Sequence, residues 1–167
     1  MKLTSKIVFI AVSIGVFFTS CEKKNCADPI PEMTFLDFAP SPTDSDYYLL
    51  TFEFADCDGD IGLEAARNIT DENGELQTNN FFIDLYHVEN NQWVKHEYEP
   101  GAAGLDYKIP PLSNSNQDPS LEGEIERKLH PIFGLEGYDS VMFKARILDN
   151  AGHYSNTVET PGFIVTF

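Results

Sequence analysis

The sequence predicts an all-β fold, in which about seven short antiparallel strands form a single sandwich behind a signal-peptide helix and a flexible tether. Apolar and polar residues alternate in short segments bounded by clusters of Gly, Pro, Asn and Asp, which is the pattern of strands with one buried face. The aromatic residues are 13 Phe and 7 Tyr against 1 Trp, and Phe and Tyr favour strands over helices.

The strand assignments follow this alternation along the chain. Strands are expected at 33–38, 47–55, 81–88, 92–98, 121–129, 141–148 and 156–167, with a further short strand at 105–109 inside an irregular stretch. The clearest is 47–55, where Phe52 and Phe54 share one apolar face. Neither an internal repeat nor a second domain is visible, so residues 32–167 are expected to form one domain.

Two of these assignments need a further reason. Asn90 and Asn91 separate the strands 81–88 and 92–98, and asparagine tolerates the positive φ of a two-residue hairpin turn. The apolar residues of 121–129 recur every four positions, which fits either a strand or a helix, and we assign a strand.

The first 20 residues predict an export signal that is removed from the mature protein. Lys2 and Lys6 precede an apolar run at 7–18, which as a helix would be about 18 Å long. The hydrocarbon core of a bilayer is about 30 Å thick. A signal peptide is therefore favoured over a membrane span.

The segment Phe18-Thr19-Ser20-Cys21 ends this run. It resembles the bacterial lipobox, with Phe18 in place of the usual Leu. The resemblance implies a diacylglyceryl group on the Cys21 thiol and acylation of its new amino group. Several acyl chains, at about 0.8 kcal/mol per buried methylene, anchor a protein firmly without a membrane helix. The alternative is an ordinary signal peptide followed by a chance cysteine.

Residues 21–31 are polar, contain two prolines and are expected to form an exposed tether. The charged residues after Cys21 loosely resemble the surface-export tag of Bacteroidota-type lipoproteins. We expect a protein held by lipid in a bacterial cell envelope, at the outer membrane. The sequence leaves open whether it faces the periplasm or the cell surface.

Two cysteines, Cys26 and Cys57, remain once Cys21 carries lipid. Exported proteins live in compartments that permit disulfides. A Cys26–Cys57 bridge would join the tether to the domain, and two free thiols are the alternative.

The chain is strongly acidic, with a net charge of −16. Both lysines of the signal peptide are lost on export, so the mature chain has 9 Lys and Arg against 27 Asp and Glu, a charge of −18. Such a surface repels phosphate backbones and excludes nucleic acid as a partner. Solubility alone accounts for most of this excess.

Two segments carry a family resemblance. VMFKARILDNAGHYSNTV, at 141–158, is similar to the final hairpin of bacterial immunoglobulin-like and fibronectin-type domains. TFEFADCDGDIGL, at 51–63, resembles a segment of Bacteroidota-type envelope lipoproteins of unknown function, with Cys57 where a glycine is more usual. The resemblance implies an immunoglobulin-like sandwich and no particular activity.

The acidic loop after strand 47–55 is the best candidate for a metal site. Asp56, Asp58 and Asp60 alternate around Gly59, and carboxylate oxygens in such a curled loop suit calcium better than magnesium. An EF-hand is excluded, because its sixth and twelfth positions would be a glycine and a glutamate. Here Ile61 and Arg67 stand there, counting from Asp56.

A second loop is expected beside the first. If 47–55 and 141–148 correspond to strands B and F of the sandwich, the loops that follow them lie at the same end. Asp149 and Asn150 would then complete a calcium site with Asp56, Asp58 and Asp60. The alternative is a set of solvated turns, since Asp and Gly favour turns without any ion.

Other constellations give weaker hypotheses. The chain has no GxSxG, HExxH, CxxC or phosphate-binding glycine loop, so we expect a protein that is not an enzyme. Tyr86, Trp93 and Tyr98 could form a platform for stacking a sugar, although sheet aromatics usually pack in the core. His87 and His96 should be diagonal neighbours across the hairpin, and nothing else marks a zinc site there.

The sequence thus predicts a non-catalytic, lipid-anchored envelope module that binds or scaffolds a partner and is stabilised by calcium. The partner would be an envelope protein or a glycan, and the membrane is reached through the lipid. An accessory glycan-binding lipoprotein is the alternative. An envelope hydrolase is weaker, because paired carboxylates are inevitable among 27 acidic residues.

Overall fold

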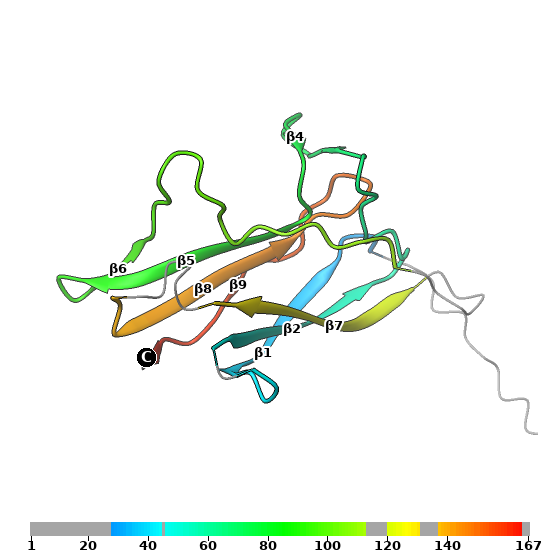
Figure 1. The fold of residues 1–167 in the computed structure, drawn as a ribbon. Helices are drawn as coiled ribbons and strands as arrows, with labels where there is room; N and C mark the ends of the chain where they lie inside the picture. Colours follow the sequence, from blue (N-terminus) through cyan, green and yellow to red (C-terminus); the bar gives the residue numbers. More distant parts are fainter. Residues whose placement is uncertain (1–27, 45, 113–119, 131–136, 165–167) are drawn as a thin grey trace, which may run out of the picture.

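The alternating segments form strands, and every regular element in the described residues is β (Figure 1). The computed structural model describes residues 28–44, 46–112, 120–130 and 137–164. The strands are β1 (Glu32–Pro40), β2 (Tyr48–Asp56), β3 (Ile69–Thr70), β4 (Leu76–Gln77), β5 (Phe81–Glu89), β6 (Gln92–Lys95), β7 (Leu121–Leu129), β8 (Ser140–Ile147), β9 (Val158–Glu159) and β10 (Phe163–Ile164). In this part of the chain no helix could cross a membrane. The expected signal peptide and Cys21 lie outside the described residues.

The strands form two main antiparallel sheets and a small hairpin. One sheet has the order β1-β2-β7, and the other has the order β10-β8-β5-β6 with β9 also paired to β8. β3 and β4 pair only with each other in the described chain. The prediction of an all-β fold is confirmed.

Strand lengths depart from the sequence pattern in three places. The strand expected at 92–98 is shorter, since β6 ends at Lys95. The last expected strand is divided into β9 and β10 at Pro161-Gly162, because proline has no N–H to donate to a ladder. The segment 105–109 forms only an isolated bridge, from Tyr107 to Phe81. The described residues therefore hold ten strands, four of them two residues long, where about seven were expected.

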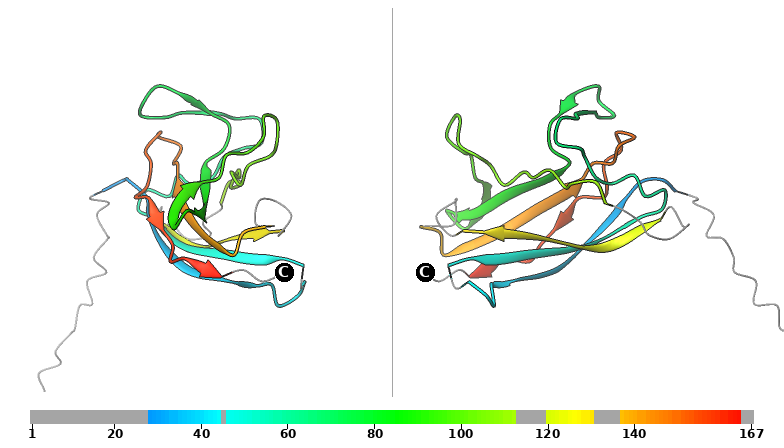
Figure 2. Two further views of the ribbon diagram at one scale, coloured as in Figure 1. Left: turned by 90° about the vertical axis from the view of Figure 1, so that its left-hand side faces the viewer. Right: turned by 45° about the vertical axis from the view of Figure 1, so that its right-hand side comes forward.

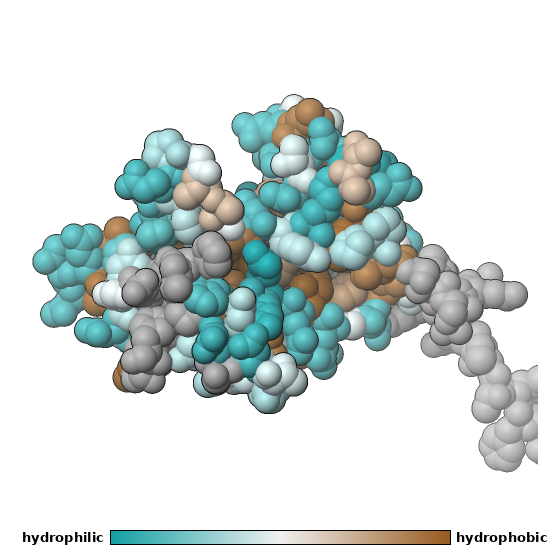
Figure 3. Space-filling model, in the orientation of Figure 1, coloured by the Kyte–Doolittle hydropathy of each residue, from teal (hydrophilic) through white to brown (hydrophobic). Residues whose placement is uncertain are grey.

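The two main sheets, whose arrangement can be followed in Figure 2, share one apolar core. The ring centroids of Phe52 and Phe81 lie 5.8 Å apart, and those of Phe38 and Phe143 lie 5.2 Å apart. Each pair joins a strand of one sheet to a strand of the other. Hydrophilic side chains predominate on the face drawn in Figure 3, as the net charge leads one to expect.

Strand register defines the two ends of the molecule. Ala55 pairs with Glu32, so β1 begins where β2 ends. We call this the loop end, because the loops after β2 and β8 lie there (Figure 1). The opposite hairpin end carries the β5–β6 turn and the last residue of β7. Asn90 and Asn91 form that turn with φ of 50° and 61°, as predicted.

Candidate metal centre

The acidic loop begins at a buried strand end. Asp56 is the last residue of β2, and its side chain is held against the core with 1% of the residue exposed. Gly59 lets the backbone turn between Asp58 and Asp60 with a φ of 70°. The three carboxylates consequently converge, and one oxygen from each lies within 4.8 Å of the others.

Two of these carboxylates have an oxygen without a partner. Oδ2 of Asp56 accepts the Ile61 N–H at 3.1 Å, but the buried Oδ1 of Asp56 has no hydrogen-bond donor. Oδ1 of Asp60 is also buried and unpartnered. Buried acceptors of this kind are rare in native proteins and require an explanation, of which a bound ion is one.

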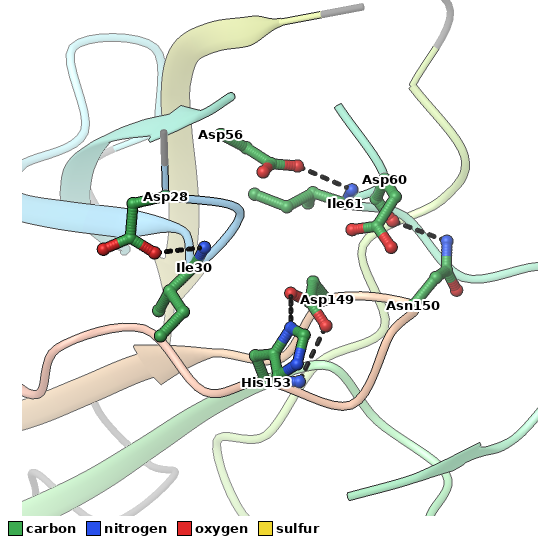
Figure 4. Close-up of polar contacts among 8 residues, drawn as sticks. All are labelled: Asp28, Ile30, Asp56, Asp60, Ile61, Asp149, Asn150 and His153. Atoms are coloured by element: carbon green, nitrogen blue, oxygen red, sulfur yellow. Dashed lines mark hydrogen bonds and ion pairs between the residues drawn. The ribbon is translucent and has the colours of Figure 1, made fainter. Parts of the chain in front are cut away.

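The loop after β8 closes over the acidic loop. The Asn150 side-chain amide donates to the carbonyl oxygen of Asp60 and to that of Gly62, the latter at 2.8 Å. Figure 4 shows Asn150 beyond Asp60 on the side away from Asp56. Asn150 therefore clamps the backbone of the acidic loop.

Asp149 is fully buried beside Asp60 and pairs with a histidine that the sequence did not single out. Its Oδ1 accepts the His153 N–H at 2.7 Å, and its Oδ2 lies 3.1 Å from Nδ1 of His153. The structure thus brings all five predicted residues to the loop end. It engages both oxygens of Asp149 with His153, and only Asp56, Asp58 and Asp60 form a tight carboxylate cluster.

Cys57 lies inside the acidic loop and is disulfide-bonded. Its expected partner, Cys26, lies outside the described residues, so that pairing stays a prediction.

A cavity of about 210 Å³ borders Asp56 and Cys57. Four of the eight described residues that line it are carboxylates, namely Asp28, Glu32, Asp56 and Glu122, and none of these eight is a lysine or arginine. This lining attracts cations. Local sequence could not predict that Asp28, Glu32 and Glu122 line this cavity. The pairing of β1, β2 and β7 brings this part of the chain to Asp56.

The electrostatics of the cluster disfavour three ionised carboxylates. Burial, together with Asp58 and Asp60, raises the pKa of Asp56 to about 6, while the Ile61 N–H opposes this effect. Burial and the neighbouring charges of Asp149 and Asp58 also raise the pKa of Asp60. A divalent cation would remove this repulsion.

The proposed sugar platform is divided by the sheet. Tyr86 and Trp93 lie on one face of the β5–β6 hairpin, since Tyr86 and Val88 alternate along β5 and Val88 pairs with Trp93. Tyr98 packs against the core, and its hydroxyl is buried. Only two of the three rings therefore share a face.

The two hairpin histidines are neighbours, as predicted. Their ring centroids lie 6.1 Å apart, and Nδ1 of His96 is 2.9 Å from the Tyr138 hydroxyl. Tyr138 stacks on His87 at 4.0 Å. Both rings therefore pack against aromatic neighbours, and the buried Nδ1 of His87 has no hydrogen-bond partner among the described residues.

Comparison with protein-family profiles, curated proteins and solved structures finds no match to this chain. The site is therefore interpreted from its geometry.

The raised pKa of Asp56 gives a pH dependence whose sign can be stated. The folded chain holds a proton on Asp56 up to a pH of about 6, whereas the ordinary aspartate value is 3.8. Without a cation, this group should therefore lower the free energy of unfolding as pH rises from about 4 to 6. Asp56→Asn removes the charge and keeps an acceptor for Ile61, so it should remove this contribution.

Urea unfolding of both proteins in calcium-depleted buffer, across pH 4 to 7.5, measures the difference. Asp46→Asn is the matched control, because Asp46 is exposed. Parallel pH profiles for wild type and Asp56→Asn would contradict the assignment.

Proposed function

We propose that the protein is a non-catalytic, lipid-anchored module of a bacterial cell envelope, with an immunoglobulin-like sandwich that calcium stabilises at the loop end. The lipid would sit on Cys21 and the ion among Asp56, Asp58 and Asp60. The module would bind or scaffold an envelope partner.

One observation carries the calcium assignment, namely the unpartnered Oδ1 of Asp56, a residue that is 1% exposed. Two ionised carboxylates whose oxygens lie within 4.8 Å of each other repel by about 3 kcal/mol or more at an effective dielectric constant of 20. A solvated turn would place these oxygens in water and avoid that cost. A cation among them provides ligation for the free oxygens and cancels the repulsion.

The donor set favours calcium over other cations. It consists of hard oxygens, without a histidine or free thiol among the described neighbours of the triad. Calcium accepts six to eight such ligands in irregular geometry, so water and backbone carbonyls could complete the shell. Magnesium demands a stricter octahedron and gives up water reluctantly.

A glycan-binding role is the second candidate, and exposed Trp93 favours it. Its indole lies over Gly162, where an added Cβ would come within 2.7 Å of Trp93 Cζ2, and the residue is 41% exposed. Trp93 is the single tryptophan of the chain. Quenching of its fluorescence by a neutral glycan panel would support this role, and a flat response across the panel would count against it.

Calcium should stabilise the full chain in non-ionic detergent. At a hundred times the dissociation constant the gain would be about 2.7 kcal/mol, which for a chain of this size corresponds to a rise in Tm of roughly 5–10 °C. Differential scanning calorimetry with calcium, magnesium or neither ion measures this shift.

The Asp58→Asn/Asp60→Asn double variant should show no calcium-induced rise. An Asp46→Asn/Asp139→Asn variant has the same change in net charge. It should keep the calcium-induced rise in Tm, because Asp46 and Asp139 are both exposed and lie outside the acidic loop. A wild-type Tm unmoved by millimolar calcium would refute the metal site.

The anchor is tested separately by mass spectrometry of the mature protein. We expect cleavage before Cys21 and the mass of a diacylglyceryl group with an acylated amino terminus. Cys21→Ser should leave the signal peptide attached and the protein without lipid. An unmodified cysteine, or cleavage at another bond, would exclude lipid anchoring and leave the calcium result unaffected.

A further inference from the structure

Arg127 occupies an unusual position on β7. Side chains alternate between the two faces of the strand, and Ile125 and Leu129, two residues before and after Arg127, are buried on the core-facing side. Arg127 therefore shares the inner face and lies opposite Leu50 of β2. Within the described residues β7 pairs only with β2, so this inward-facing arginine lies on an edge strand.

The positive charge of Arg127 has no carboxylate partner among the described residues. Three lysines form ion pairs at 2.7–2.9 Å, namely Lys95 with Asp84, Lys128 with Asp44 and Lys144 with Glu159. Arg127 instead lies 5.3 Å from the centroid of the Tyr107 ring, and its buried Nε has no acceptor. Arg67 and Arg146 also form no ion pair in the described residues, but Arg127 alone of the three has a buried nitrogen without an acceptor, and burying a polar group without a partner is costly.

A cavity of about 240 Å³ opens beside this arginine at the hairpin end. Its lining combines cationic, aromatic and apolar groups: Tyr47, Leu105, Arg127, Lys128 and Leu129, with Ala103, Gly104 and His130. The charge of Lys128 is already met by Asp44 at 2.9 Å. The uncompensated charge of the cavity is therefore that of Arg127.

We propose that this cavity binds a small carboxylate-bearing ligand, the size of one sugar acid or one acidic amino acid, through the guanidinium of Arg127. The planar guanidinium matches a carboxylate with two parallel hydrogen bonds. The cavity is smaller than the roughly 300–1,000 Å³ of sites for drug-sized molecules, which limits the ligand to such a unit. Tyr47 and Leu105 provide an apolar wall for the rest of the ligand.

The location of the cavity suits a ligand presented from outside. Leu129 pairs with Tyr48, at the opposite end of β2 from Asp56. If the proposed anchor holds the chain through its tether, the cavity lies at the end remote from the start of β1 and hence from the membrane. Binding itself depends on neither the anchor nor calcium.

A purely structural role makes a different prediction. A charge on the inner face of an edge strand discourages pairing with a second chain. That role requires the charge of Arg127 but no ligand, and lysine would fulfil it as well as arginine.

Nuclear magnetic resonance can observe the guanidinium directly, because the chain has only three arginines, Arg67, Arg127 and Arg146. The full chain, labelled with ¹⁵N in non-ionic detergent and chelator-free buffer, is titrated with glucuronate and, separately, with N-acetylglutamate. We expect the Arg127 Nε–Hε signal to shift saturably, with a dissociation constant on the order of 1 mM. Which probe binds more tightly identifies the source of the carboxylate.

Arg127→Lys keeps the charge and loses the paired hydrogen bonds, so binding followed through backbone amide signals should weaken by about tenfold or more. Arg67→Lys is the matched control, because Arg67 is exposed, and it should bind as wild type does. Arg127→Gln provides a second variant should the lysine form fail to fold. The proposal is overturned if neither probe shifts the Arg127 signal, if glucose or sodium chloride shifts it equally, or if Arg127→Lys binds unchanged.

Discussion

The apolar core shared by the two sheets is the constraint on which the rest of the structure depends. Phenylalanine rings from both sheets meet there, Phe52 with Phe81 and Phe38 with Phe143. Because alternate residues of each long strand must fill this core, the numerous carboxylates can only face solvent or collect where strands end. Asp56, the last residue of β2, lies where the core meets the acidic loop and is buried for that reason.

Among the described residues, each end of the molecule holds a charged group with a buried atom that lacks a hydrogen-bond partner, carboxylates at one end and a guanidinium at the other. At the loop end, carboxylates with unpartnered oxygens lie beside a cavity lined by further acids. At the hairpin end, Arg127 lies beside aromatic side chains and a small cavity, and none of the described residues that line this cavity has a carboxylate. Residues that break the local rules of packing and pairing are where functional sites are expected, because such residues cost folding free energy. The intervening core keeps the two regions apart, so each can be altered without the other.

Much of the fold follows from the sequence because two-residue alternation is a local property. It predicted β2, β5, β7 and β8 to within one residue and β1 to within two, and the side-chain chemistry of Asn90 and Asn91 predicted the hairpin turn. The hairpin of β3 and β4 was not predicted, because two-residue strands are too short to alternate. The segment 105–109 has strand-like alternation, yet it makes one bridge only, since its Ile109 N–H donates instead to the Asn80 side chain at 2.7 Å.

By itself the sequence determined the strand pattern, the acidic surface and the closeness of Asp56, Asp58 and Asp60, which follows from their spacing around Gly59. Only the tertiary structure decided that Asn150 clamps a loop 90 residues away, that Asp149 is buried near Asp60, and that Arg127 lines a cavity. The physical reason is that local spacing fixes which neighbours a residue has along the chain, whereas the packing of the sheets fixes which distant groups it meets.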